Sequence, residues 1–193
     1  MTSTSVQSVL MVGVGGQGII RASDILSAVL MKAGFDVKKS EVHGMAQRGG
    51  CVSSHVRFGP KVYSPLAKKG EVGVLVSFEK LETLRYLDYL RGDGKVIIND
   101  EEVYPPSVNL GEEPYPDDAV DFIKQYFMDV KVVDATGIAL RSGDRRMANT
   151  VILGVLSAHL DADCGVWEAV LAESFSPKIL KKNIEAFKLG RGV

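Results

Sequence analysis

Cysteine is scarce in this chain, and the scarcity excludes several kinds of site. The 193 residues contain two cysteines, Cys51 and Cys164, which lie far apart in the sequence. They make no CxxC pair and no disulfide framework, and they are too few to supply the ligands of zinc or of an iron–sulfur cluster. We therefore expect that this chain holds no cluster by itself.

Charge of one sign and long apolar runs are also lacking. The 23 basic and 24 acidic residues give a formal net charge of -1, which provides no long-range field to attract nucleic acid or an anionic membrane. No segment reaches about 18 uninterrupted apolar residues, and residues 1–7 lack the basic and apolar regions of a signal peptide. We expect a cytoplasmic protein with neither nucleic acid nor a membrane as a partner.

Metal and nucleophile motifs are missing as well. His43, His55 and His159 do not lie at the spacing of metal ligands, so no metal site is expected. No serine stands in a GxSxG elbow, which leaves a hydrolase triad without support. No GK[ST] follows the first glycines, and this excludes a P-loop.

The chain does contain an alternation of strand-like and helix-like segments. Its 46% hydrophobic and 24% charged residues are typical of a compact globular protein, and its length predicts one domain over residues 1–193. The alternation predicts an α/β fold, a three-layer sandwich with a mostly parallel sheet and a Rossmann-like start, in which strand 51–58 is the candidate antiparallel member. The expected strands are 8–12, 35–42, 51–58, 72–78, 95–99 and 130–133, and the expected helices are 19–32, 79–90, 117–126, 146–160, 166–174 and 177–189, with a turn at 91–94 and a proline-rich surface loop at 104–116.

A glycine-rich turn joins the first expected strand to the first expected helix. Its GxGxxG spacing occurs where amides at a helix N-terminus bind phosphate. The alternative is that the glycines only allow a sharp turn and close packing of the helix, and both interpretations stay open. A dinucleotide site also needs an acid about 20 residues further on, for which Asp36 comes too early and Glu41 fits only roughly. The candidate cofactor-binding residues are Gly13, Gly15, Gly16, Gln17 and Gly18.

A second unusual loop connects two expected strands at residues 40–50. It places Glu, His, Gln and Arg among three glycines where a short turn would have sufficed, and loops of that kind often hold a ligand or a partner. Arginine offers a planar fork of donors, so an anionic group is the expected guest. Alternatively, His43 and Arg48 brace the loop by pairing with Glu41 or with a carbonyl group. The candidate substrate or interface residues are Glu41, His43, Gly44, Met45, Gln47, Arg48, Gly49 and Gly50.

Two charged clusters lie nearer the C-terminus. Asp144 is placed to cap the amides of the helix at 146–160, while Arg145 and Arg146 are available to meet an acidic partner. Four lysines at helix-like spacing predict one solvated helix face with no specific function. They are Lys178, Lys181, Lys182 and Lys188.

Three segments together resemble a known family. They are GVGGQGIIRAS at residues 13–23, SEVHGMAQRGG at 40–50 and SSHVRFG at 53–59. In their order and spacing they resemble the beta subunits of indolepyruvate:ferredoxin oxidoreductases, which are similar to the gamma subunits or domains of the pyruvate and 2-oxoglutarate enzymes. The resemblance covers nearly the whole chain, and the HGMAQRGG form looks like the branch that acts on arylpyruvates.

The resemblance implies a supporting role in the oxidative decarboxylation of a 2-oxoacid. In this family thiamine diphosphate carries the decarboxylation, iron–sulfur clusters pass electrons to ferredoxin, and coenzyme A accepts the acyl group. The resemblance further implies that a large partner subunit holds these cofactors and that this chain binds none of them alone. The two glycine-containing loops are then expected to face the large subunit, where they complete its active-site cavity or help to seat the phosphates of coenzyme A.

Two further functions stay open beside that one. A free-standing Rossmann-type NAD(P)-dependent dehydrogenase would use the GxGxxG loop, and a regulatory ligand-binding module would use the same fold. The triplet Gly92-Asp93-Gly94 looks like part of a thiamine diphosphate motif, but it precedes a strand, so a turn is the better interpretation.

Overall fold

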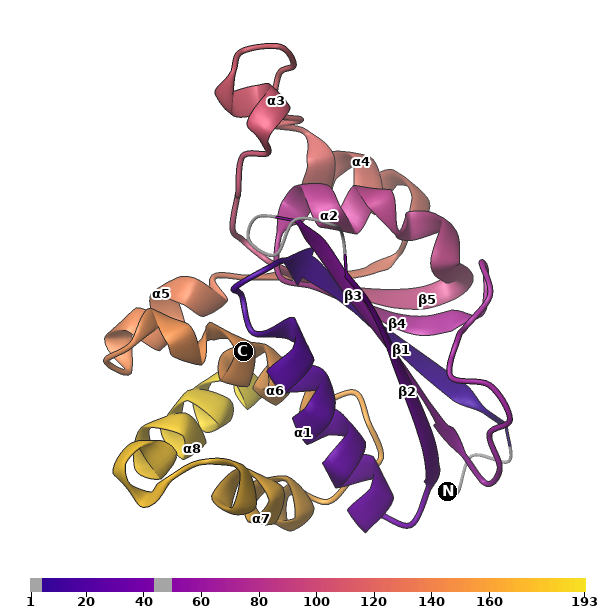
Figure 1. The fold of residues 1–193 in the computed structure, drawn as a ribbon, viewed down its shortest axis with the longest axis vertical. Coiled ribbons are helices and arrows are strands. Elements are labelled where there is room, and N and C mark those ends of the chain that lie inside the picture. The colour runs from indigo at the N-terminus through magenta and orange to yellow at the C-terminus, as the bar shows by residue number, and fades with distance from the viewer. Residues whose placement is uncertain (1–4, 44–49) are drawn as a thin grey trace.

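The order of the strands determines which connections of the described chain lie next to one another. The computed structural model describes residues 5–43 and 50–193, with the side chain of His43 outside the described part. Within those residues the chain forms one six-stranded sheet in the order β2-β3-β1-β4-β5-β6 (Figure 1). The strands are β1 (Gln7–Val14), β2 (Asp36–His43), β3 (Cys51–Gly59), β4 (Val72–Ser77), β5 (Leu90–Asn99) and β6 (Asp129–Val133).

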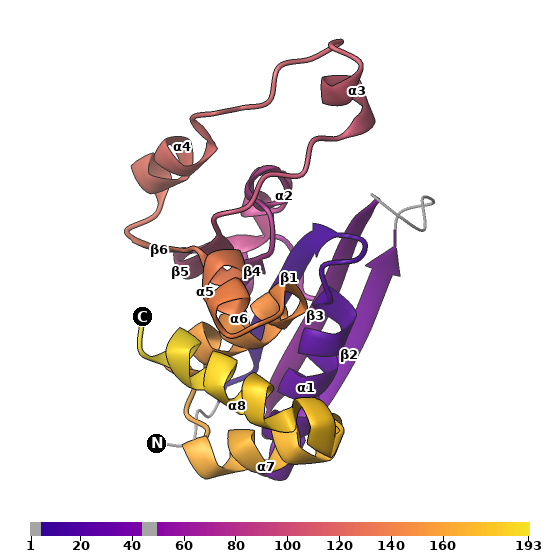
Figure 2. The same cartoon turned by 90° about the vertical axis from the view of Figure 1, so that its left-hand side faces the viewer.

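Strand direction brings three loop ends to one edge of the sheet. Pairing is parallel from β1 through β4 and β5 to β6, whereas β3 pairs antiparallel with both β1 and β2. Strand β3 is therefore the antiparallel member, as predicted. Because β1 and β2 run in the same direction, they end at the edge where β3 begins (Figure 2). There Val14 pairs with Cys51, and His43 pairs with Val52.

Helices cover both faces of the sheet, which confirms the predicted three-layer α/β fold (Figure 1). One layer holds α1 (Ile19–Lys32), α5 (Ala135–Arg141), α6 (Ala148–Ser157), α7 (Cys164–Ser174) and α8 (Pro177–Arg191), with the 3₁₀ turn η2 (Arg145–Met147). The other layer holds α2 (Lys80–Arg85), the 3₁₀ turn η1 (Leu87–Tyr89) and α4 (Ala119–Tyr126), while the short α3 (Pro106–Asn109) projects beyond them.

Strand β1 lies at the centre because both of its faces are apolar. Val9 and Met11 pack into the core beneath α1, α6 and α8, whereas Leu10 and Val12 pack into the second core beneath α2 and α4. All four side chains are at most 1% exposed. A strand buried on both sides shows a continuous apolar run instead of an alternation, which is why the sequence signal at residues 8–12 is so clear.

Two predicted boundaries after β4 are wrong. The expected helix at 79–90 ends at Arg85, because Tyr86 leaves the helical conformation with φ -119, and Leu90 already belongs to β5. The expected turn at 91–94 lies inside β5, where the pairing with β4 shifts between Val72 and Val74. An irregular strand of this kind contains the glycines that otherwise mark a turn.

Two short helices follow β5 and β6 where the sequence predicts none. Helix α3 begins at Pro106, a position where the missing N–H of proline does no harm, so prolines here start a helix inside the expected loop. Helix α5 contains Gly137, which weakens the helix signal, but the side chain of Asp134 caps it by accepting from the Gly137 N–H at 2.7 Å. Among the described residues, no helix combines the length and apolar character needed to cross a membrane.

Candidate functional site at the glycine loop

The β1–α1 connection lies where the sheet changes its direction of winding. From β1 the chain passes to α1 on one face, and from the neighbouring β4 it passes to α2 on the other face. The two connections diverge and leave a crevice at the carboxyl ends of the parallel strands, which is the usual place for a ligand in an open α/β sheet. The glycine loop forms one wall of that crevice.

The glycines of this loop serve two different purposes. Gly16 and Gly18 have φ values of 106 and 82, a left-handed conformation that glycine adopts without strain. Gly13 has ordinary backbone angles, but an added Cβ atom would lie 2.8 Å from the Cβ atom of Phe78. Gly13 therefore allows close packing, whereas Gly16 and Gly18 shape the turn.

Gln17 fastens the glycine loop to the β4–α2 connection. Its Oε1 atom accepts from the N–H of Val14 at 2.8 Å, and its Nε2 atom donates to the carbonyl oxygen of Phe78 at 3.0 Å. Both ends of the amide are thus engaged within the chain. Gln17 lines the crevice, and its main effect there is to hold the loop in position.

The crevice is an open cavity of about 510 Å³. The glycine loop lines one side of it, and the polar groups that face it come from the end of β5, from the residues after β5, from α5 and from η2. They are Asn99, Glu101, Thr136, Arg145 and Arg146. The cavity is therefore built from segments that are far apart in the sequence. Figure 2 shows that these segments meet at the carboxyl edge of the sheet.

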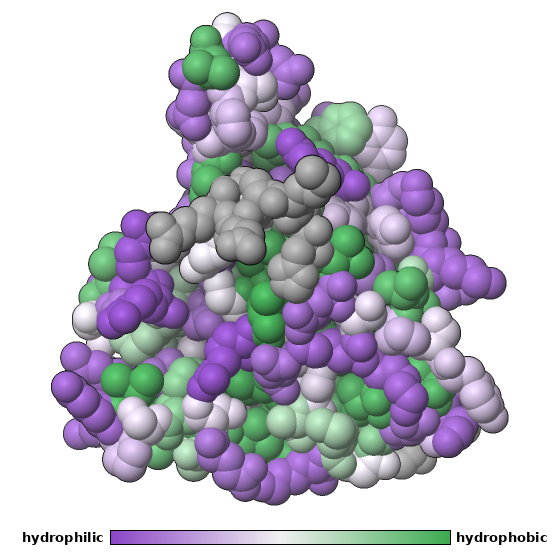
Figure 3. Space-filling view, in the orientation of Figure 1, coloured by the Kyte–Doolittle hydropathy of each residue, from purple (hydrophilic) through white to green (hydrophobic). Residues whose placement is uncertain are grey.

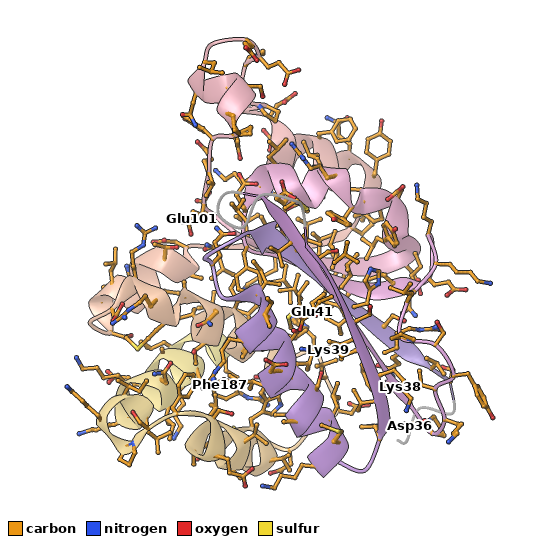
Figure 4. The ribbon with its side chains drawn as sticks, in the orientation of Figure 1. Asp36, Lys38, Lys39, Glu41, Glu101 and Phe187 are labelled. Carbon is orange, nitrogen blue, oxygen red and sulfur yellow. The ribbon has the colours of Figure 1, made fainter. Side chains whose placement is uncertain are left out.

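Glu101 is the centre of a polar network in this cavity (Figure 4). Its Oε2 atom accepts from the Asn99 amide at 2.8 Å and from the Thr136 hydroxyl at 2.7 Å, and its Oε1 atom accepts from Arg145 at 3.1 Å. Asn99 also accepts from the N–H of Ala135 at 3.0 Å. The network fixes the ends of β5 and β6 relative to each other.

Asn99, Glu101 and Thr136 were not predicted as site residues, although the sequence contains a signal for them. Each of them lies at or just after the end of a parallel strand, and the carboxyl ends of such strands meet at one edge of the sheet. Arg145 was expected to meet an acidic partner, and the acid it meets in this structure is Glu101 of the same chain.

Arg146 and Asp144 form a local pair beside the cavity. The Asp144 carboxylate accepts from the Arg146 backbone N–H at 2.9 Å, as predicted for a cap, and from the Arg146 guanidinium at 2.9 Å. The hydrogen bonds from Arg146 lower the pKa of Asp144 to about 2. The capped element is the turn η2, because the expected helix at 146–160 is divided into η2 and α6.

The second predicted loop begins and ends beside the glycine loop. The N–H of Gly15 donates to the carbonyl oxygen of Gly50 at 2.9 Å, at the edge of the sheet where β2 ends and β3 begins. The predicted site residues Gly44, Met45, Gln47, Arg48 and Gly49 lie outside the described residues, as does the side chain of His43. The two loops thus leave the sheet at adjacent points.

Glu41 takes part in a charged cluster on the face of β2 that α1 covers (Figure 4). Its carboxylate pairs with Lys39, which also pairs with Asp24 of α1. Burial alone would lower the pKa of Lys39, but the hydrogen bonds to Asp24 and Glu41 outweigh it and raise that pKa. The cluster anchors β2, an edge strand, to the helix above it.

The geometry does not supply the ribose-binding acid of a dehydrogenase. Asp36 begins β2 and so lies at the edge opposite the glycine loop, where it accepts from the N–H of Val62 at 2.8 Å. Glu41 is engaged by Lys39, and β3 separates β2 from β1 in the sheet. Neither Asp36 nor Glu41 is therefore placed to bind the ribose of a dinucleotide at the glycine loop.

The two cysteines do not form a cluster site. Cys51 lies 3.1 Å from the Tyr86 hydroxyl, and burial, followed by the hydrogen bond with Glu82, raises the pKa of its thiol to about 11. Cys164 begins α7 and packs against the core beneath α1, α6 and α8. Within residues 5–42 and 50–193, no three His, Cys, Asp or Glu side chains lie where they could hold a metal ion.

Comparison with known proteins agrees with the resemblance carried by the three motifs. The sequence profile of the family described as pyruvate ferredoxin/flavodoxin oxidoreductase matches residues 8–193. Indolepyruvate oxidoreductase subunit IorB of Archaeoglobus fulgidus is 36% identical over 95% of this chain and 92% of its own length. The subunit of the same name from Thermococcus kodakarensis is 35% identical over 95% and 93%. The predicted resemblance is confirmed.

Solved structures share the fold. Pyruvate oxidoreductase subunit PORC of Thermotoga maritima superposes with a TM-score of 0.75 and 22% identity, over 97% of this chain and 96% of its own. The 2-oxoglutarate:ferredoxin oxidoreductase of Magnetococcus marinus, solved with coenzyme A bound, gives a TM-score of 0.76 at 20% identity, over 97% of this chain and 30% of that longer one. The same fold therefore occurs both as a separate subunit and as part of a larger chain.

Proposed function

This chain belongs to the pyruvate ferredoxin/flavodoxin oxidoreductase family, and we propose that it is the small subunit of a heteromeric enzyme that oxidises an arylpyruvate such as indolepyruvate. The names of relatives at 35–36% identity support that substrate class. The relatives named as subunits of pyruvate and ketoisovalerate enzymes are less similar, at 29% identity for the one from Thermococcus kodakarensis. The acyl group passes to coenzyme A, and the electrons pass to ferredoxin.

The observation that carries the proposal is the hydrogen bond between Gly15 and Gly50. It joins the glycine loop to the end of the loop at 40–50, so that both leave the sheet at one edge. We propose that this edge faces the large subunit and helps to close its active-site cavity. The residues assigned to this face are Gly13, Gly15, Gly16, Gln17 and Gly18 from the first loop, and Glu41, His43, Gly44, Met45, Gln47, Arg48, Gly49 and Gly50 from the second.

The described part of this edge suits the phosphates of coenzyme A. The cavity beside the glycine loop is open, and the lack of side chains at Gly15 and Gly16 lets a ligand approach the backbone closely. Arg145 and Arg146 lie on its rim with side chains 66% and 87% exposed. Glu101 pairs with Arg145 and Asp144 pairs with Arg146, so an anion would be bound by the donor groups that these two pairs leave exposed. When bound, coenzyme A accepts the acyl group.

We assign thiamine diphosphate and the iron–sulfur clusters to the large subunit. The two cysteines of this chain lie on opposite faces of the sheet, so they cannot share a cluster. Single thiolates do not hold such clusters, which need several cysteine ligands. This subunit therefore contributes shape and charge to the cavity and binds no redox centre of its own.

The first experiment measures activity with and without this chain. The large subunit is produced alone and together with this chain, and each preparation is assayed for viologen reduction that depends on indolepyruvate and coenzyme A. We expect activity only when both chains are present, with indolepyruvate used better than pyruvate or 2-oxoglutarate. Full activity of the large subunit alone would refute the subunit assignment, and equal use of all three acids would refute the arylpyruvate assignment.

A second experiment tests the loop at 40–50 by replacing Arg48 with alanine. In the reassembled complex, Arg48→Ala is expected to raise the KM for the oxoacid or for coenzyme A, or to weaken association of the subunits. The control is Arg141→Ala, which removes an exposed arginine at the end of α5. Wild-type KM values for both substrates together with tight association would mean that the loop has no such role.

A further inference from the structure

A second cavity of about 450 Å³ lies between η2 and the first two turns of α8, next to the crevice at the glycine loop, with which it shares Arg146. Its charged lining consists of Asp144, Arg146, Lys178 and Lys182. Figure 3 shows hydrophilic and hydrophobic residues side by side over this part of the surface, at the lower left where α8 lies. The lysines here are two of the four that the sequence analysis interpreted as a plain solvated helix face.

The charges of the lining do not cancel. Three cations and one carboxylate leave an excess of two positive charges. The Asp144 carboxylate is held by the Arg146 guanidinium at 2.9 Å, so the excess belongs to the lysines. Among residues 5–42 and 50–193, no ion pair within 4.0 Å joins Lys178 or Lys182 to a carboxylate. Two lysines without such a pair at one cavity are available to an anion from solution.

The positions of the two lysines are set by the backbone. They stand four residues apart on α8, which places them on the same face of the helix. The ammonium group of Lys182 lies over Gly143, where an added Cβ atom would be 3.1 Å from it. Gly143 has φ 107, so glycine is needed there for the turn and also leaves the space that the ammonium group uses.

The rest of the lining is apolar on one side and polar at its base. Phe175, Ile179 and Met147 form the apolar wall, and Ile179 remains 45% exposed. Asn183 at the base is 4% exposed and fixed, because it accepts from Thr150 at 2.9 Å and donates to the Ile179 carbonyl at 3.0 Å. The cavity therefore combines a rigid base, an apolar wall and a cationic rim.

We propose that this cavity binds a phosphate monoester with a small apolar or aromatic body. A phosphate monoester carries a charge of about -1.5 to -2 at neutral pH, which matches the excess on the lining. Lysine ammonium groups bind phosphate as compact charges, and the apolar wall holds the ester group. The site adjoins the proposed edge that faces the large subunit, since Arg146 lines both cavities, but the two lysines that carry this proposal line only the second one.

Phenyl phosphate is the probe for the test, titrated into the full chain in a calorimeter. We expect saturable binding at one site, and tighter binding than that of inorganic phosphate. The double variant K178Q/K182Q should weaken binding roughly tenfold, as expected for the loss of two exposed charge contacts. Ile179→Ala should reduce the affinity for phenyl phosphate toward that for inorganic phosphate, with the affinity for inorganic phosphate unchanged.

The control is K181Q/K188Q, which removes the same charge from the same helix outside the cavity lining. An equal loss in both double variants would reduce the effect to long-range attraction and overturn the site. Absence of saturable binding, or loss of binding when the large subunit is added, would overturn it too. Competition by coenzyme A would identify the phosphate ester as part of that cofactor, and lack of competition would identify a separate ligand; the site stands in both cases.

Discussion

Gly190 of α8 lies so close to Val151 of α6 that an added Cβ atom would overlap the Val151 carbonyl oxygen. The relationship is reciprocal, since an added Cβ atom at Gly154 of α6 would overlap the carbonyl oxygen of Phe187, which Figure 4 labels. The two helices therefore touch backbone to backbone. This contact explains why α8 can cover the buried helix α6 without a layer of side chains between them.

Substitution of Gly154 by alanine is the first prediction. The new methyl group must push the backbones of α6 and α8 apart, and overpacking of this kind costs about 1–3 kcal/mol of unfolding free energy. Urea unfolding of Gly154→Ala measures this loss directly. The control is Gly192→Ala at the end of α8, where an added Cβ atom would be 3.6 Å from its nearest neighbour and no loss is expected. Equal stability of the two variants would contradict the backbone contact.

Substitution of Gln17 by glutamate tests the fastening of the glycine loop. The shape is kept, but the Nε2 atom that donates to the Phe78 carbonyl becomes an acceptor. A broken hydrogen bond with two facing acceptors costs about 1–3 kcal/mol. We expect Gln17→Glu to lower the unfolding free energy by that amount in urea titrations. Gln125→Glu on the exposed side of α4 is the matched control, and a comparable effect there would mean that the added charge, not the lost bond, is responsible.

Elements bounded by local signals are those that the sequence predicts best. Helix α1 is found at the predicted residues 19–32, because its apolar face repeats regularly and Gly18 and Gly34, both with positive φ, bound it. Segments whose ends depend on distant contacts are predicted less well. The short α2, for example, is stabilised by Glu79, whose buried carboxylate accepts from the N–H groups of both Glu82 and Val103.

The same distinction applies to the site. The glycine loop is a local motif and was found, whereas Asn99 and Thr136 are single polar residues that gain meaning only when β5 and β6 lie side by side. Strand order is a property of the whole fold. Likewise, Lys178 and Lys182 look like an ordinary helix face until Gly143 and Asp144 are placed beside them.

The thiol of Cys51 is predicted to react slowly with iodoacetamide. Burial, followed by the hydrogen bond with Glu82, raises its pKa from 9.0 to about 11, so below pH 9 the reactive thiolate is about 100-fold less abundant than for an unperturbed thiol. In a Cys164→Ser background, mass spectrometry should show a rate that still rises tenfold per pH unit between pH 9 and about 10. Glu82→Gln should shift the curve to lower pH. A plateau above pH 9 would show that the thiol is unperturbed.

His55 is predicted to make the protein less stable in mild acid. It is 4% exposed, and burial, followed by the charge of Arg57, lowers its pKa below 6.5, so the folded state favours the neutral ring. As the pH falls through 6.5 the unfolded chain binds a proton first, and the unfolding free energy decreases by up to about 1.4 kcal/mol per pH unit. Above that pH the contribution of the neutral ring is complete.

Urea unfolding at pH 7.5 and at pH 5.5 measures this dependence. The His55→Gln variant has no group to titrate at this position, so its loss of stability between the two pH values should be smaller than that of the wild type. The difference between pH values is the quantity compared, because it is independent of any cost of the substitution itself. Some loss should remain in the variant, since burial, followed by the charge of Lys95, also lowers the pKa of His159. Equal losses in both proteins would mean that His55 is protonated as readily in the folded state as in the unfolded one.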